Sequence, residues 1–299
     1  MIVLRKQRGR SLANLAIDTL SLEGIQKDLT DEVQKLVHLS VCESTTSTNE
    51  VLKDQARIET CPYFALAARE QTAGKGRRQK SFYSPKDCGV YLSLVVPNKA
   101  IVAGIEYITP LAAVAVCRAL KQSCGIAPDI KWINDIYYKG NKLCGILCET
   151  IQSGAPQHEA LTVIGVGINV YSEANTVSNN KGARSTQHAS DPKADMVPQS
   201  HNFAYLSDTP QKGLLNKICA KLINELITSL EMQKDDVYAA YKGAMFLRGQ
   251  DVYVTSSNDK NEAYRAHVID LHPNLQLEVQ LEDGSRKLLN YESCTLSLL

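Results

Sequence analysis

The sequence predicts an α+β fold followed by a small β domain at the C-terminus. Short apolar runs typical of strands, such as 64–68, occur together with amphipathic helical segments in the larger, N-terminal part of the chain. The clearest helix is expected over 214–230, where leucine and isoleucine recur every three or four positions. From Gln250 the period changes to two, and leucine or valine alternates with polar residues over 275–281. This change of period indicates a domain boundary near 247–249.

Composition limits the kinds of partner that the chain can attract. With 299 residues and 44% hydrophobic content it is long enough for two domains, and its net charge of +1 provides no global field for nucleic acid or membranes. The nine cysteines contain no CxxC pair, which is typical of a reducing compartment and favours a cytoplasmic location. A basic N-terminus, with no acid before Asp18, leaves a mitochondrial presequence as the alternative.

Local patterns predict three further segments. Residues 1–40 are expected to form an N-terminal arm with one or two short helices over 12–39. The polar segment 171–203, whose charges cancel, is expected to be a disordered surface insertion. Thr109-Pro110 is expected to open a helix, with threonine as the N-cap and proline in the first helical position.

The stretch 131–149 is the most informative part of the sequence. A strand-like run ends in a polar cluster that includes Lys131 and Asn134, turns at 139–141, and re-enters as an apolar strand carrying Gly145. This pattern predicts a β-hairpin. Its charged and amide groups require either a solvated face or a binding site.

Two glycine-rich segments also follow predicted strands. The basic loop, residues 74–80, comes soon after the strand at 64–68 and follows Gln71, and the run Gly165-Val-Gly-Ile-Asn169 ends a strand that begins at 161. Flexible backbone and polar groups at the end of a strand are typical of a pocket.

Together with Ser47-Thr48-Asn49, these elements resemble the biotin protein ligase family, also called holocarboxylase synthetases. The matching order is STN, QxxGxGRR, KWxND with KLxGIL, and GxGIN, and the resemblance covers roughly 41–299. It implies a class II synthetase-like, mixed and largely antiparallel sheet with flanking helices over 41–247, and an SH3-like domain over 248–299. Some bacterial members repress transcription through an added DNA-binding domain, which the arm at 1–40 is too short to contain.

The chemistry implied is activation of biotin with ATP, followed by transfer to a lysine of a biotin carrier domain. Joining two anions requires cations near the phosphate, which lysine, arginine and Mg²⁺ bound to the ATP phosphates can supply. By resemblance, the catalytic residues are Lys131, Arg77 and Lys75. The biotin-binding residues are Ser47, Thr48, Asn49, Gln71, Gly74, Lys75, Lys131, Gly145, Gly165 and Gly167. The ATP-binding residues are Gly76, Arg77, Arg78, Phe82, Lys131, Asn134 and Asn169. The expected partners are the biotin carrier domains of biotin-dependent carboxylases, with no nucleic acid or membrane partner.

The sequence departs from the family pattern at three positions. Lys75 and Gln79 replace the usual arginine and glycine of the basic loop, and Ile133 replaces the proline of KWPND. Lys75 keeps the charge but loses the planar fork, and Gln79 is expected to stiffen the loop.

Several alternatives stay open at this point. Asn134 and Asp135 also suit a simple turn, residues 47–49 also suit a helix N-cap, and the similar residues 44–46 allow an assignment displaced by three. For the whole chain, the rivals are a lipoate or octanoate ligase with an apolar acyl tunnel, and a nucleic-acid-binding module that uses the basic loop.

Overall fold

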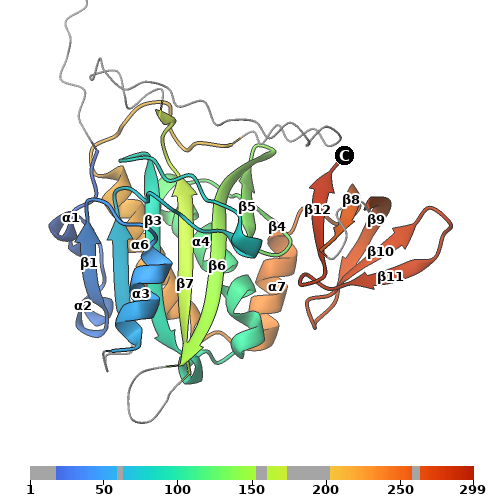
Figure 1. Ribbon diagram of the computed structural model, residues 1–299, viewed down its shortest axis with the longest axis horizontal. Helices are drawn as coiled ribbons and strands as arrows, with labels where there is room; N and C mark the ends of the chain where they lie inside the picture. Colours follow the sequence, from blue (N-terminus) through green and yellow to red (C-terminus); the bar gives the residue numbers. More distant parts are fainter. Residues whose placement is uncertain (1–17, 59–62, 153–159, 174–202, 258–262) are drawn as a thin grey trace, which may run out of the picture.

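The computed structural model describes residues 18–58, 63–152, 160–173, 203–257 and 263–299. They form a seven-stranded sheet with helices on both faces and a separate five-stranded sheet at the C-terminus (Figure 1). The predicted α+β fold class is therefore confirmed. The first 17 residues of the expected arm and residues 174–202 of the expected insertion lie outside the described residues.

The large sheet is mixed and largely antiparallel, with the strand order β1-β2-β3-β7-β6-β5-β4. Its strands are β1 (His38–Cys42), β2 (Phe64–Ala68), β3 (Gly89–Pro97), β4 (Asp129–Lys131), β5 (Asp135–Tyr138), β6 (Asn141–Gln152) and β7 (Ala160–Asn169). Only β1 and β2 pair in parallel. The predicted hairpin is confirmed, since β5 and β6 pair across a turn at 139–140.

Helices cover the two faces of this sheet unequally. Figure 1 shows α4 (Ile108–Cys124), α6 (Leu214–Ser229) and α7 (Lys234–Ala244) behind the sheet, and α3 (Thr48–Ala56) alone in front. The helix predicted over 214–230 is confirmed as α6, and it is buried along its apolar face. Two short helices, α1 (Leu22–Gln26) and α2 (Asp31–Leu36), pack against α6. Because β3 is covered on both sides, every one of its residues is buried.

The predicted start of α4 was wrong by two residues. A short 3-10 turn, η3 (Ile105–Tyr107), runs directly into the helix, so α4 begins at Ile108 and Thr109 is already helical. Pro110 is tolerated there because the first-turn N–H groups have no partner within the helix. Two other 3-10 turns are η1 (Arg77–Gln79) in the basic loop and η2 (Asn98–Ala100) after β3.

The C-terminal sheet confirms the period-two pattern. It consists of β8 (Asp251–Ser256), β9 (Ala263–Leu271), β10 (Leu277–Leu281), β11 (Arg286–Leu289) and β12 (Cys294–Leu298), all antiparallel, in the order β11-β10-β9-β8-β12. The Asp283-Gly284 turn has Gly284 at φ +83, a conformation that favours glycine. Among the residues described, no helix is long and apolar enough to cross a membrane.

Candidate active site

Sheet register brings the predicted residues of four strands into one row. Lys131 on β4 is paired with Asp135 on β5, Asp135 with Gly145 on β6, and Gly145 with Gly167 on β7. Directly paired residues in an antiparallel sheet point to the same face, so all four lie on one side. Gly165, two positions along β7, is on this side as well and lies against Asn49 of α3.

The three glycines of this face form a surface that we call the glycine surface: Gly145, Gly165 and Gly167. A Cβ atom added to Gly165 would lie 2.1 Å from Asn49 Oδ1, and one added to Gly167 would lie 2.4 Å from the ring of Phe82. Such distances are impossible for real carbon atoms. The glycines therefore allow Asn49 and Phe82 to approach the main chain of β7 directly.

Above the glycine surface, a buried polar network consists of the buried residues Thr48, Asn49 and Ser93 together with the half-buried Gln71. Gln71 Oε1 accepts hydrogen bonds from the Thr48 N–H (2.9 Å) and hydroxyl (3.1 Å). Ser93 Oγ lies 2.7 Å from Thr48 Oγ1 and 2.5 Å from Asn49 Oδ1. Gln71 thus caps α3 with its side chain, whereas Ser47 stands at the N-cap position without a side-chain capping bond.

Burial distinguishes the two possible assignments of the STN motif. Ser47, Thr48 and Asn49 are 2–3% exposed, whereas Ser44 and Thr46 are exposed. Polar groups that are buried must be hydrogen-bonded, and those of residues 48–49 are. Residues 47–49 thus lie inside the protein beside the glycine surface, whereas Ser44 and Thr46 face solvent.

Sequence reasoning missed Ser93 and the partner of Asn49. Asn49 Nδ2 donates to Glu149 Oε2 at 2.9 Å, and Lys53 lies 2.8 Å from the other oxygen of the same carboxylate. Glu149 therefore fixes the orientation of the Asn49 amide. The available signal for Ser93 was a single serine inside the run 90–96, at a position that is fully buried.

The basic loop has a tight, hairpin-like form, and its cations point to opposite sides. Gly76 N–H donates to the Lys80 carbonyl at 2.7 Å, and Phe82 N–H donates to the Gly74 carbonyl at 2.8 Å. Lys75 Nζ lies 2.9 Å from Glu50 of α3.

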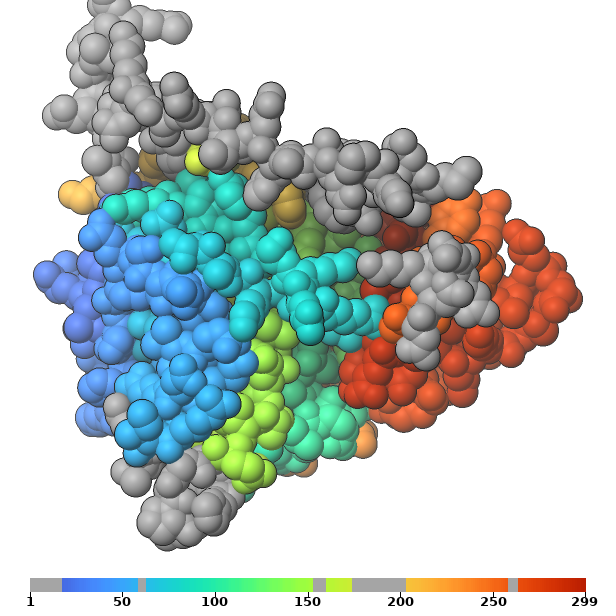
Figure 2. Space-filling view, viewed as in Figure 1, coloured from blue at the N-terminus to red at the C-terminus, as the bar shows by residue number. Residues whose placement is uncertain are grey.

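Arg77 extends the other way. Its guanidinium donates to Asn134 Oδ1 at 3.0 Å and to the Tyr291 carbonyl at 2.9 Å, so it joins the turn before β5 to the C-terminal sheet. Arg78, expected at the nucleotide, donates to the carbonyls of Tyr291, Glu292 and Cys294 at 2.8–3.2 Å. In Figure 2 the cyan segment that contains the loop reaches across to the red C-terminal sheet.

Lys131 lies at the end of the row, in a largely buried position. Its Nζ is 3.2 Å from the Tyr137 hydroxyl and 5.2 Å from the centre of the Tyr137 ring. Burial lowers the pKa of Lys131 below its usual value, although the nearby Asp135 carboxylate acts in the opposite direction. Asp135 itself is paired with Lys142 at 2.7 Å.

Asn134 and Asn169 occupy different positions. Asn134 Nδ2 donates to the Ile146 carbonyl at 2.9 Å, while its Oδ1 accepts from Arg77, so the side chain joins the turn, β6 and the basic loop. Asn169 is paired with Gly89 at the end of β7, two positions beyond Gly167 on the same face.

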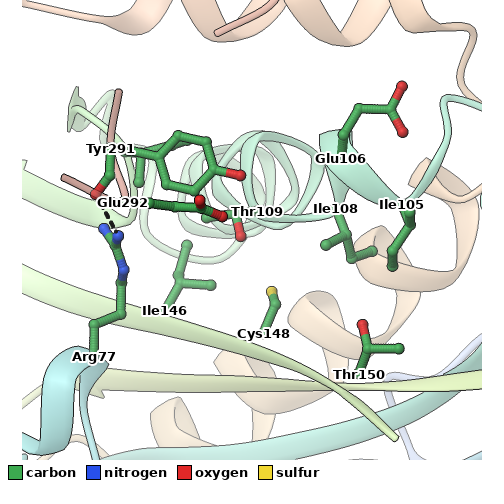
Figure 3. A pocket seen from close by; sticks show the side chains of 11 residues that line it. Arg77, Ile105, Glu106, Ile108, Thr109, Ile146, Cys148, Thr150, Tyr291 and Glu292 are labelled. Carbon is green, nitrogen blue, oxygen red and sulfur yellow. Dashed lines mark hydrogen bonds between the residues drawn. The ribbon is translucent and has the colours of Figure 1, made fainter. Parts of the chain in front are cut away.

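A cavity of about 290 Å³ lies beside Arg77, on the opposite face of β6 (Figure 3). Ile146 and Cys148 of β6 line it together with Thr109 of α4 and Tyr291 of the C-terminal part. Burial raises the pKa of Cys148 to about 12, so its thiol stays protonated and is no nucleophile at neutral pH.

The region that contains this site is similar to known proteins. Residues 41–169, which contain the row, the basic loop and the buried polar network, match the model of the Biotin/lipoate A/B protein ligase family. This region therefore resembles a ligase domain of that family.

Curated relatives show a similarity of the same kind. The chain is 35% identical over 159 residues to the bifunctional ligase/repressor BirA of Bacillus subtilis. The aligned region covers 52% of this chain and 47% of the relative. It is 34% identical over 159 residues to the biotin–[acetyl-CoA-carboxylase] ligase of Paracoccus denitrificans, covering 50% of this chain and 64% of that protein. The chain thus spans about half to two thirds of the length of these relatives.

The fold extends beyond the matched region. The biotin protein ligase of Aquifex aeolicus, solved in complex with biotin and ATP, superimposes with a TM-score of 0.62 and 20% sequence identity, covering 88% of this chain and 99% of that chain. The likeness includes more of the chain than the ligase domain alone, and at this identity it shows the fold.

Proposed function

We propose that this protein is a biotin protein ligase, which forms biotinyl-5′-AMP from biotin and MgATP and then transfers biotin to a lysine of a carrier domain. The proposal rests on the row of paired residues. Lys131 lies at the β4 end of this row, and the buried polar network lies at the β7 end, against the glycine surface. One end of this site is cationic and the other end presents hydrogen-bonding groups, which suits a ligand with a carboxylate at one end and a neutral polar ring at the other.

Activation requires stabilisation of charge at phosphorus. The biotin carboxylate oxygen attacks the α-phosphorus of ATP, the bond to the bridging oxygen breaks, and pyrophosphate leaves with that oxygen. We propose that Lys131 neutralises charge on the α-phosphate and the carboxylate, assisted by Arg77, which is bonded to Asn134 in the turn after β4. We propose that Lys75, Gly76 and Asn169 bind the adenylate from the other side of the row.

We propose that the metal ion in this reaction is Mg²⁺ bound to the ATP phosphates, where it would neutralise charge on the leaving pyrophosphate.

The buried polar network favours biotin over a lipoyl or octanoyl group. The ureido ring of biotin has both N–H donors and a carbonyl acceptor. Thr48 and Gln71, which bond to each other, and Asn49, which bonds to Ser93, can exchange these bonds for bonds to such a ring. An apolar acyl chain has no hydrogen-bonding groups, so it could not replace any hydrogen bonds that these side chains gave up to admit it. Mass spectrometry of the adenylate that copurifies with the protein distinguishes the two ligases.

Transfer needs no nucleophile from the enzyme. The deprotonated carrier lysine attacks the carbonyl carbon of the mixed anhydride, AMP leaves as the phosphate anion, and the amine proton passes to solvent. We propose the biotin carrier domains of biotin-dependent carboxylases as partners, and the cytoplasm as the location.

A nucleic-acid-binding role for the basic loop is the other rival. Arg78 donates its hydrogen bonds to three main-chain carbonyls of this protein, so its guanidinium has fewer donors left for a nucleic-acid phosphate backbone. A salt-titrated binding assay with DNA and RNA tests this rival.

The deciding experiment is incubation with biotin, MgATP and a purified biotin carrier domain, followed by intact mass. We expect one added biotinyl group on the carrier, dependent on ATP and on the carrier lysine. An unchanged carrier mass, with lipoyl or octanoyl transfer in the parallel reaction, would overturn the proposal.

A further inference from the structure

The basic loop is held by a part of the chain more than two hundred residues away. We call residues 290–293, between β11 and β12, the C-terminal turn. Main-chain carbonyls of this turn accept hydrogen bonds from Arg77 and Arg78. The carbonyl of Cys294, the next residue, accepts a further bond from Arg78. Because the acceptors are main-chain atoms, no acidic side chain of the turn is needed to hold the two arginines.

The Tyr291 side chain adds a contact of its own. The Arg77 guanidinium carbon lies 5.6 Å from the centre of the Tyr291 ring, within the range of a cation–π interaction. The Tyr291 ring also meets Trp132 edge to face, with ring centres 6.4 Å apart and an angle of 80° between the ring planes. Trp132 is itself fixed, since its indole N–H donates to the Leu275 carbonyl at 3.0 Å.

Arg77 is thus fixed from both sides at the border of the cavity. Asn134 holds it from the turn that follows Lys131, and Tyr291 holds it from the C-terminal sheet, as Figure 3 shows for Tyr291. An arginine has five N–H donors in a rigid plane, so two bonds of this kind set the direction of those that remain. Displacement of the C-terminal turn would remove one of the two fixed points.

We propose that Tyr291 is a positioning residue of the ligase: its ring and carbonyl orient the Arg77 guanidinium toward the phosphate of the adenylate. This inference rests on the proposed function, because it takes the adenylate phosphate to lie near Lys131 and Arg77. If Tyr291 orients Arg77, the C-terminal sheet contributes to activation and to retention of the intermediate. Arg78, which donates to three carbonyls of this region, then anchors the loop.

The test compares Tyr291→Ala with Tyr291→Phe, both of which keep the main-chain carbonyl. Loss of the aromatic face should raise the KM for ATP in pyrophosphate release by about 2- to 30-fold, the range of a cation–π contact. Released adenylate should then label a bystander such as serum albumin more strongly. Tyr291→Phe should restore both values to near the wild type.

A double-mutant cycle with Arg77→Gly separates positioning from general stability. If Tyr291 acts through Arg77, Tyr291→Ala should change neither the KM for ATP nor bystander labelling further in the Arg77→Gly background. A purely structural role would instead lower the melting temperature and the active fraction, with the KM for ATP unchanged. If Tyr291→Ala fails to fold, Tyr291→Leu, which fills the space without a π face, decides the question by the same measurements.

The outcomes distinguish this inference from the proposed function. Absence of biotin-dependent pyrophosphate release in the wild type contradicts the proposed function. Normal release in the wild type, with an unchanged KM in Tyr291→Ala or an equal defect in Tyr291→Phe, contradicts the role of Tyr291. A Tyr291→Ala effect that persists in the Arg77→Gly background contradicts it as well.

Discussion

The buried polar network and the basic loop are held in different ways. Thr48, Asn49 and Ser93 are buried within the sheet face, and short hydrogen bonds connect them. Arg77 and Arg78 are held by the main chain of a distant turn, and Arg78 adopts a left-handed conformation, with φ +55.

This difference suggests how the two ends of the site work. A buried and internally bonded network is organised before the ligand arrives, so the part that would recognise biotin keeps its geometry in the absence of ligand. A loop held by two arginine side chains to a distant turn can change its contacts at a lower cost. The following experiments test this contrast.

The largest effect is expected from Lys131→Ala, which leaves the buried polar network intact. Removing a charge-assisted contact made mainly in the transition state should slow adenylate formation by about 10²- to 10³-fold. Biotin-dependent pyrophosphate release measures this rate. The matched control is Lys121→Ala, an exposed lysine near the end of α4, which should leave the rate unchanged. Release at the wild-type rate from the Lys131 variant would remove this residue from the reaction.

The next largest effect is expected from Gly165→Ala, which breaks the buried polar network. The new methyl group would meet the Asn49 amide, and the free energy of unfolding should fall by about 1–3 kcal/mol. The KM for biotin should rise together with this loss. Urea denaturation and biotin titration provide the two measurements.

The matched control for Gly165→Ala is Gly243→Ala in α7. An added Cβ at Gly243 meets no atom within 4 Å, so this change should stabilise the helix by about 0.5–1 kcal/mol. Equal behaviour of the two alanine variants would mean that Asn49 is not held against β7.

A smaller, pH-dependent effect should come from the lowered pKa of Lys131. The lysine is charged below its pKa and neutral above it, so adenylate formation should fall by about tenfold per pH unit above that pKa. Because burial lowers this pKa, the fall should begin below the 10.5 of an ordinary lysine. Lys131→Arg, which stays charged, should show no such fall. The measurement is pyrophosphate release, which reports activation alone. The transfer rate is unsuitable, because transfer requires a deprotonated carrier lysine and therefore becomes faster as the pH rises. A fall at the same pH in both proteins would assign it to another group.

The smallest effect is expected from Gln79→Gly in the basic loop. Gln79 has φ +60, a conformation that costs most residues about 1–2 kcal/mol and glycine little. Glycine should therefore leave activation within about threefold of wild type, with faster release of the intermediate and more bystander labelling. Lys139→Gly makes the same change at φ +51 in the β5–β6 turn, away from the loop, and should not alter labelling. Less labelling from Gln79→Gly would show that the glutamine does not stiffen the loop.

Much of the fold could be predicted because its signals are local. The apolar periods of α6 and of the C-terminal strands follow from alternation along the chain. The start of α4 could not be predicted in the same way, since the preceding turn at 105–107 merges with the helix and replaces the expected threonine cap. Ser93 was overlooked because a hydroxyl in an apolar strand becomes informative only when its partners on α3 are known.

The sequence by itself determined the order of the motifs, the residue types at the site and the change from a mixed fold to a β domain. Those properties depend on side-chain chemistry and on contacts between residues close in the chain. Tertiary structure decided that Lys131, Gly145 and Gly167 share one row, because strand register aligns residues of separate strands. It also decided that Lys75 turns toward α3 while Arg77 turns toward Tyr291. Neighbouring residues of one loop can point to opposite sides, and only the packing of distant segments selects which partner each cation meets.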